Sequence, residues 1–126
     1  MTREELVRLA VLMNIADACE EPVRVYQRVA GDLGPCGLWV APEETQDALI
    51  KLTESGLAKA YRMSGAYSRE PSAAELQGVP PFDGSYNYYF YITEDGLRSL
   101  AIGRAREDWP LDDECELIPG WPGVSD

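Results

Sequence analysis

The stretch Pro42-Glu-Glu-Thr-Gln-Asp-Ala-Leu-Ile-Lys-Leu-Thr-Glu-Ser-Gly-Leu57 decides the expected fold. A proline followed by two acids is typical of the first turn of a helix, where the backbone N–H groups lack partners and the dipole favours negative charge. Ala48, Leu49 and Leu52 then recur at helical spacing, and Thr45 extends the same face. Gly56 predicts a left-handed residue that ends the helix. The sequence therefore predicts a capped amphipathic helix that turns sharply at Gly56.

Two strands and a last helix are predicted after this turn. Leu57–Met63 is the first strand, and Ser85–Thr93 is the second, in which aromatic residues alternate between the two faces. The long connection between them is rich in Gly, Pro and Ser, and Ser72-Ala-Ala-Glu75 can cap a single helical turn within it. Thr93 caps the last helix, whose predicted inward residues are Leu97, Leu100 and Ala101.

Two helices are predicted before Pro42. The first, Glu4–Ala18, is capped by Thr2 and is apolar around most of its circumference, so it needs more than one surface to pack against. Either the rest of the domain or a second copy of the chain can supply that surface, and the sequence leaves both open. The second starts at Pro22, where Val25, Val29 and Leu33 follow helical spacing; the alternation of Val23-Arg-Val25 also allows a strand, but length and context favour the helix. Gly31–Gly37 is expected to be a glycine-rich loop, and the short strand-like run Leu38-Trp-Val40 follows it.

Charge is distributed unevenly along the 126 residues. The net charge is −11, from 22 acids and 11 bases. Seven of the acids and none of the bases fall in residues 107–126, which leaves 15 acids against 11 bases, a net charge of −4, for residues 1–106. We therefore expect a folded domain over 1–106 and an acidic tail over 107–126. Because the tail also carries Trp109, Leu111 and Trp121, it is expected to dock in an extended form on the domain or on a partner subunit.

Two segments resemble winged helix–turn–helix regulators of the MarR and PadR type. Ala41–Arg62 is similar to their recognition helix and first wing strand, through Leu49, Leu52, Gly56 and Leu57. Tyr91-Ile-Thr-Glu-Asp-Gly-Leu-Arg-Ser-Leu100 is similar to their returning strand and following helix. The resemblance implies an α+β winged helix–turn–helix fold: about three N-terminal helices, an antiparallel wing of two or three strands, and one C-terminal helix.

The family resemblance implies a homodimeric transcriptional regulator that contacts double-stranded DNA. The side chains expected to touch DNA lie on the recognition helix and the wing, namely Thr45, Gln46, Lys51, Arg62 and Arg69. Arginines at 3, 8, 24 and 28 would add a basic patch if the first two helices aligned them. However, Glu43, Glu44 and Asp47 stand at the exposed start of the recognition helix, where they repel phosphates.

The acidic recognition helix supports a second hypothesis, a winged-helix module that binds protein. One face of the tyrosine-rich strands must pack on the helices, and the other can present aromatic rings to a partner. The side chains expected to contact such a partner are Tyr89, Tyr91, Trp109 and Trp121.

Catalytic and cofactor chemistry is not indicated. The chain has no histidine, its three cysteines lack metal-site spacing, and no phosphate-binding glycine loop occurs. We expect no enzyme activity, cofactor or metal. No apolar run approaches the roughly 18 residues that span a bilayer, and no signal peptide is recognised. The expected location is the cytoplasm.

Overall fold

The computed structural model describes residues 1–16, 19–64, 67–72, 75–76 and 88–109. The described elements make an α+β fold, as predicted from the sequence. They are, in chain order, α1 (Arg3–Asn14), α2 (Pro22–Leu33), the 3₁₀ turn η1 (Gly34–Cys36), α3 (Pro42–Glu54), β1 (Ala58–Ser64), β2 (Tyr67–Arg69), β3 (Tyr88–Ile92) and α5 (Glu94–Arg104).

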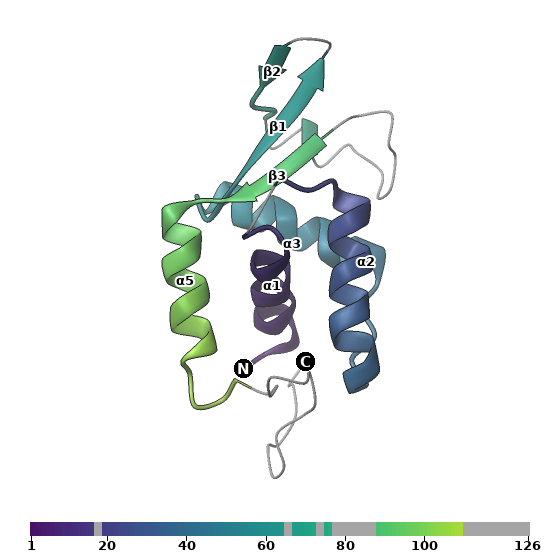
Figure 1. Cartoon of the computed structure of the whole chain (residues 1–126), viewed down its shortest axis with the longest axis vertical. Coiled ribbons are helices and arrows are strands. Elements are labelled where there is room, and N and C mark those ends of the chain that lie inside the picture. The colour runs from purple at the N-terminus through teal and green to yellow at the C-terminus, as the bar shows by residue number, and fades with distance from the viewer. Residues whose placement is uncertain (17–18, 65–66, 73–74, 77–87, 110–126) are drawn as a thin grey trace.

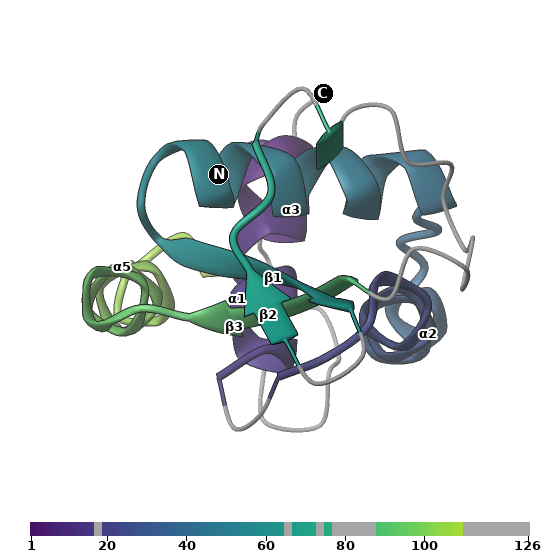
Figure 2. The ribbon, with the colours of Figure 1, turned by 90° about the horizontal axis from the view of Figure 1, so that it is seen from above.

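Helix α1 forms the centre of the molecule. It lies between α5 and α2, and the sheet lies at the end of the helices away from the N-terminus (Figure 1). Seen from the sheet end, α3 lies across one side of α1, while α5 and α2 flank the strands (Figure 2). The core is a cluster of buried residues to which α1, α2, α3 and the sheet contribute, and Leu100 of α5 packs against it.

The apolar circumference of α1 is covered by its own chain. Leu6, Val11, Leu12 and Ile15 are each at most 1% exposed. Burial of each leucine or isoleucine side chain stabilises the fold by roughly 1.5–3 kcal/mol relative to exposure. The rest of the domain therefore supplies most of the surface that α1 needs, and α1 is a core element.

The ends of α1 differ in how well the sequence predicted them. Thr2 caps the helix as expected: its hydroxyl accepts a hydrogen bond from the Glu5 N–H, and the Glu5 carboxylate accepts one from the Thr2 N–H. The helix stops at Asn14, before the predicted end at Ala18. The Asn14 side chain donates to the Ala10 carbonyl and to Asp32 on α2. The next carbonyl, that of Ile15, accepts a hydrogen bond from the Ile92 N–H of β3.

Residues 38–40 were predicted to be strand-like, and this prediction is wrong. They form no strand within the described part of the chain. Instead the Arg3 guanidinium donates to the Trp39 carbonyl, which gives that backbone oxygen a partner outside any sheet. The Trp39 ring is 76% exposed and lies over Gly34, where an added Cβ would come within 3.0 Å of the ring.

The turn after α3 has the predicted geometry. Gly56 has a φ of 79°, in the left-handed region that favours glycine. The Gly56 N–H donates to the Thr53 carbonyl and the Leu57 N–H donates to the Leu52 carbonyl, which is the Schellman arrangement that satisfies the last carbonyls of a helix. This turn feeds the chain directly into β1.

The sheet has one more described strand than the two long strands predicted. Its order is β2-β1-β3, and both pairings are antiparallel. Strand β2 lies in the connection that was predicted to be loop, because Tyr67–Arg69 is too short to give a pattern of its own. The capping interaction predicted nearby is present: the Ser72 hydroxyl accepts a hydrogen bond from the Glu75 N–H. The predicted inward face of the last strand is confirmed for Tyr88, Phe90 and Ile92.

The outer edge of β3 is paired to the segment that joins α1 and α2. Glu20 forms an isolated antiparallel bridge with Phe90, and each backbone N–H donates to the other's carbonyl over 2.9 Å. Together with the Ile92–Ile15 hydrogen bond, this bridge ties the third strand to the N-terminal helices.

Helix α5 packs through two glycines and Leu100, so its predicted inward face is confirmed only for Leu100. Thr93 caps it as expected, through a hydrogen bond from the Gly96 N–H. The buried positions, however, are Gly96 and Gly103, whereas Leu97 is 49% exposed and Ala101 is also exposed. Without a Cβ at either glycine the helix can approach β1 and α1 closely, and in this orientation Leu97 and Ala101 face solvent while Leu100 packs against the core.

The close approach of α5 gives a prediction with an internal control. A Cβ at Gly96 would lie 2.1 Å from the Leu57 carbonyl oxygen, a backbone atom that cannot easily move, whereas Gly31 in α2 has nothing within 4 Å of that position. We expect Gly96→Ala to lower the free energy of unfolding by roughly 2 kcal/mol or more, in the range of overpacked sites. Gly31→Ala is expected to raise it by about 0.5–1 kcal/mol, because alanine favours the helix. Urea unfolding of the three proteins measures both changes, and equal stability of Gly96→Ala and wild type would contradict the packing.

Candidate functional site

The outward surface of α3 is where the resemblance placed DNA contacts, and Thr45 is not on it. Thr45 is 1% exposed, so it belongs to the inward face together with Ala48 and Leu49, and the prediction that it touches base edges is wrong. Its hydroxyl has no hydrogen-bond partner among the described residues. The spacing with Ala48 and Leu49 was the correct signal, because positions three and four apart share a helix face.

Gln46 is half-buried and faces the connection between β2 and β3. Its side-chain amide lies 3.4 Å from the Leu76 carbonyl and can donate a long hydrogen bond to it. Leu76 itself is buried at 2% exposure. Gln46 therefore takes part in a contact within the fold.

The basic residues at the junction of α1 and α3 are engaged by acids. Lys51 forms an ion pair with Glu4 over 2.7 Å, and this hydrogen bond holds the pKa of the Glu4 carboxyl below its usual value. Arg3 donates to both oxygens of Glu44, at 2.9 and 3.1 Å, and these bonds likewise lower the pKa of Glu44. The Glu44 carboxylate also accepts the Ala41 N–H, which completes the first turn of α3. Each of these cations therefore already has a carboxylate from the neighbouring helix.

The acids that remain on α3 point to solvent. Glu43 and Asp47 are exposed, and neither forms an ion pair with another described residue. Asp47 also lines a shallow cavity of about 310 Å³ between α1 and α3, together with Arg8 and Lys51. The outward surface of α3 is consequently acidic, whereas contact with DNA phosphates requires cations.

The arginines predicted to meet DNA lie apart from α3. Arg62 is half-buried on β1, with its guanidinium carbon 5.8 Å from the centre of the Tyr88 ring. Arg69 lies on β2, but its side chain is outside what the structure describes. On α2, Arg28 pairs with Glu20 at 2.9 Å and Arg24 is exposed. Arg3 and Arg8 line the cavity between α1 and α3, whereas neither Arg24 nor Arg28 lines it.

The outer face of the sheet carries a group of tyrosines. The Tyr61 and Tyr91 rings stack with centroids 5.2 Å apart, and their hydroxyls share a hydrogen bond of 3.0 Å. That bond, with burial second, raises the pKa of Tyr91 above its usual value. Tyr89 is half-buried opposite Tyr61, and Lys59 is exposed opposite Tyr91. We call Lys59, Tyr61, Tyr89 and Tyr91 the tyrosine face.

Sequence reasoning named Tyr89 and Tyr91 for this surface but omitted Tyr61 and Lys59 from the expected contacts. Their place depends on strand register, since Lys59 is paired with Tyr91 and Tyr61 with Tyr89. Lys59 is further held by Glu70, 3.0 Å away, and this hydrogen bond raises the pKa of Lys59. The alternation of Lys59 and Tyr61 with buried alanines was the signal that could have found them.

The start of the acidic tail is attached to the domain. Trp109 packs against the core of its own chain, so the part of it that is buried is not available to a partner. Asp108 accepts hydrogen bonds from Arg106 and from the Met1 amine, each at 2.7 Å, and these hold the pKa of its carboxyl well below the usual range. The folded body therefore extends to residue 109, three residues past the predicted boundary. Trp121, the other expected contact, lies outside the described residues.

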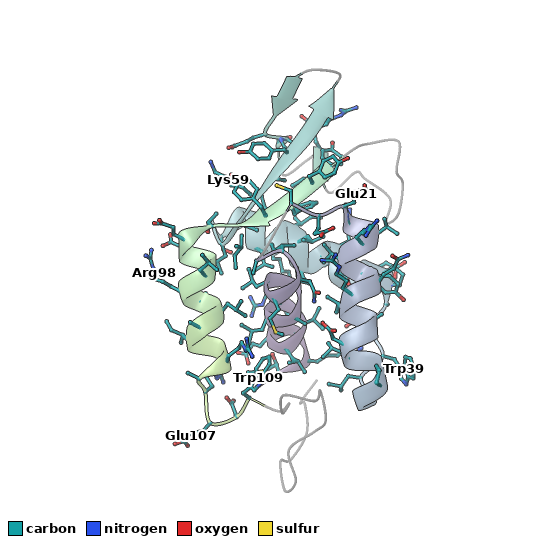
Figure 3. All side chains as sticks on the ribbon, viewed as in Figure 1. Glu21, Trp39, Lys59, Arg98, Glu107 and Trp109 are labelled. Atoms are coloured by element: carbon teal, nitrogen blue, oxygen red, sulfur yellow. The ribbon has the colours of Figure 1, made fainter. Side chains whose placement is uncertain are left out.

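The tyrosine face and the start of the tail lie at opposite ends of the molecule. Figure 3 shows Lys59 on the sheet, while Trp109 and Trp39 lie at the far ends of the helices. No group of three His, Cys, Asp or Glu side chains that could hold a metal ion occurs in the described part of the chain. Among the same residues, no helix is long and apolar enough to cross a membrane.

Comparison of the chain with protein-family models, with curated proteins and with solved structures found no match.

The Arg3–Glu44 pair predicts a pH dependence of stability. Because folding lowers the pKa of Glu44, the pair stabilises the protein above the ordinary value of 4.5 and is lost as the pH falls below it. Glu44→Gln keeps an acceptor for the Ala41 N–H but removes the charge. We expect it to cost about 0.5 kcal/mol at neutral pH, since both partners are about one-third exposed. Thermal unfolding across pH should show the two proteins converging in acid.

Glu43→Gln is the matched control for this experiment, because Glu43 is the exposed neighbour of Glu44 and forms no ion pair with a described residue. Glu43→Gln should leave the pH dependence of thermal unfolding the same as in wild type. A constant difference between Glu44→Gln and wild type at every pH would contradict an ionic contribution.

Proposed function

We propose that this chain is a winged-helix protein that binds a protein partner, and that α3 does not serve it as a DNA-reading helix. The order of the elements supports the winged-helix part: three helices precede an antiparallel sheet, the Gly56 turn joins α3 directly to β1, and a capped helix follows β3. This is the order that the resemblance to MarR- and PadR-type regulators implies.

The observation that carries the choice of partner is the charge of α3. Its outward acids Glu43 and Asp47 form no ion pair with a described residue, while Lys51 is already paired with Glu4. A helix that enters the major groove passes between two rows of phosphates, so each unpaired carboxylate there weakens binding. Docking on DNA would also have to break the Lys51–Glu4 pair to free its cation.

The tyrosine face is the surface that we assign to the partner. Stacked Tyr61 and Tyr91 present a rigid aromatic surface with polar edges, which is the composition that protein interfaces favour. The ion pair of Lys59 with Glu70 adds a charged rim. The shared hydroxyl hydrogen bond fixes the two rings before a partner arrives, so that less side-chain entropy is lost on binding.

A second candidate is a homodimeric transcriptional regulator that contacts double-stranded DNA. The exposed Arg24 and the partly exposed Arg28 on α2, with Arg62 on β1, favour it because they are cations outside α3. Since the rest of the domain covers most of α1, a second copy would dock mainly on other elements.

DNA binding is tested with a labelled duplex of random sequence in low-salt buffer, where counterion release favours binding most. We expect wild type to show no change in fluorescence anisotropy. Glu43→Lys combined with Asp47→Lys should produce binding that weakens as salt is added. Glu94→Lys combined with Glu107→Lys makes the same change of charge on and beyond α5, and it should produce much weaker binding. Detectable binding by wild type would support the second candidate instead.

The protein-binding proposal is tested by affinity capture from nuclease-treated extract with wild type and with Tyr89→Thr/Tyr91→Thr, in which threonine keeps the preference for strand. We expect at least one protein to be captured by wild type and lost by this variant. Arg24→Thr/Gln27→Thr changes two exposed residues of α2 and should retain that protein. If wild type and both variants capture every protein equally well, the tyrosine face is not the binding surface.

A further inference from the structure

A groove with an apolar floor lies between α1, the end of α3 and α5. Its volume is about 260 Å³. The apolar residues that line it are Leu9, Leu12, Leu52, Leu57 and Ile102. Ile102 is 69% exposed, so one wall of this α1–α5 groove is open to solvent. The glycine contacts of α5 bring the helix close to α1 but leave this apolar wall uncovered.

Two arginines, Arg8 and Arg106, lie at the rim of the groove, and they differ in whether a carboxylate of the described chain binds them. Arg106 is held by Asp108. Arg8 is half-buried, and its guanidinium forms no hydrogen bond or ion pair with any described residue, although its charge contributes to the lowered pKa of Glu4. A partly buried guanidinium beside an apolar surface is a favourable site for a carboxylate, because the charge-assisted hydrogen bonds are little screened there. The groove thus suits an apolar segment with carboxylates next to it.

The C-terminal residues 110–126 have this combination of apolar and acidic side chains, and the chain enters them next to the rim of the groove. Arg106 both lines the groove and binds Asp108, and Trp109 is packed on the core, so the chain leaves the described body beside the groove. The remaining 17 residues, 110–126, contain five acids and no base. Leu111, Leu117, Ile118 and Trp121 are their large apolar residues. At about 3.3 Å per extended residue, a segment of this length can reach roughly 56 Å from residue 109.

We propose that residues 110–126 of the same chain occupy the α1–α5 groove. Leu117, Ile118 and Trp121 cover its apolar floor, and the carboxylates of the 112–116 cluster meet the Arg8 guanidinium. The attachment at residue 109 makes this binding intramolecular, which gives an effective concentration of the order of millimolar without further contacts. This proposal is independent of the proposed function, because no residue of the tyrosine face lines the groove.

Cys115 lies within the acidic cluster and allows a direct test in the full-length chain. Ser99 lines the groove and is half-buried. With Cys19 and Cys36 replaced by serine, Ser99→Cys should form an intramolecular disulfide with Cys115 under mild oxidation. Gln27→Cys, on the exposed side of α2, should do so at least about tenfold more slowly, since the same tether does not hold the tail there. Intact-mass spectrometry and non-reducing gels follow the reaction.

The charge and the apolar contacts are tested separately on the Ser99→Cys background. Arg8→Glu should slow the trapping severalfold, and Arg24→Glu should not. Leu117→Ser combined with Trp121→Ser should also slow it. Thermal unfolding of each protein establishes that the domain is intact. Equal trapping at positions 99 and 27 would overturn the proposal, and disulfide-linked dimers at low protein concentration would show that the tail occupies a second copy instead.

Discussion

The corner at Gly56 and Leu57 is the constraint on which the rest of the molecule depends. Gly56, in the left-handed conformation, ends α3 and leads the chain into β1. The backbone carbonyls of the corner also accept hydrogen bonds from Thr93, the residue that caps α5. The Gly56 carbonyl accepts a hydrogen bond from the Thr93 hydroxyl, and the Leu57 carbonyl accepts one from the Thr93 N–H. Gly96 lies against that same Leu57 oxygen. One turn thus fixes the end of one helix, the start of another and the register of the strands between them.

The positions that this corner leaves outside the core are the ones available for binding. Helix α5 approaches through glycines, so it exposes Leu97 and Ile102 and forms one wall of the α1–α5 groove. Strand register places Tyr61 beside Tyr91 on the outer face of the sheet. On α3, by contrast, the ion pair of Lys51 with Glu4 engages the cation that a DNA-reading helix would need. Packing therefore offers apolar and aromatic surfaces more readily than basic ones.

The sequence predicted the elements that local chemistry determines. Thr2 and Thr93 cap their helices, Pro22 and Pro42 begin theirs, and Gly56 ends α3 as expected. Features set by distant contacts were not predictable in this way. The end of α1 at Asn14 depends on Asp32, and the orientation of α5 depends on how closely two glycines allow it to pack. For the candidate site, alternation identified Tyr89 and Tyr91, whereas the contact of Tyr61 with Tyr91 needed the strand register, and the pairing of Lys51 needed the crossing of α1 with α3.

The bridge between Glu20 and Phe90 protects the folded chain against aggregation. Tyr88–Ile92 is an aromatic, uncharged strand with an outer edge, the type of segment that pairs readily with another molecule and seeds aggregation. In the folded chain, the outward N–H groups of Phe90 and Ile92 are taken by the carbonyls of Glu20 and Ile15. The short connection between α1 and α2 therefore shields this edge, and its local opening would expose an aggregation-prone strand before the core itself unfolds.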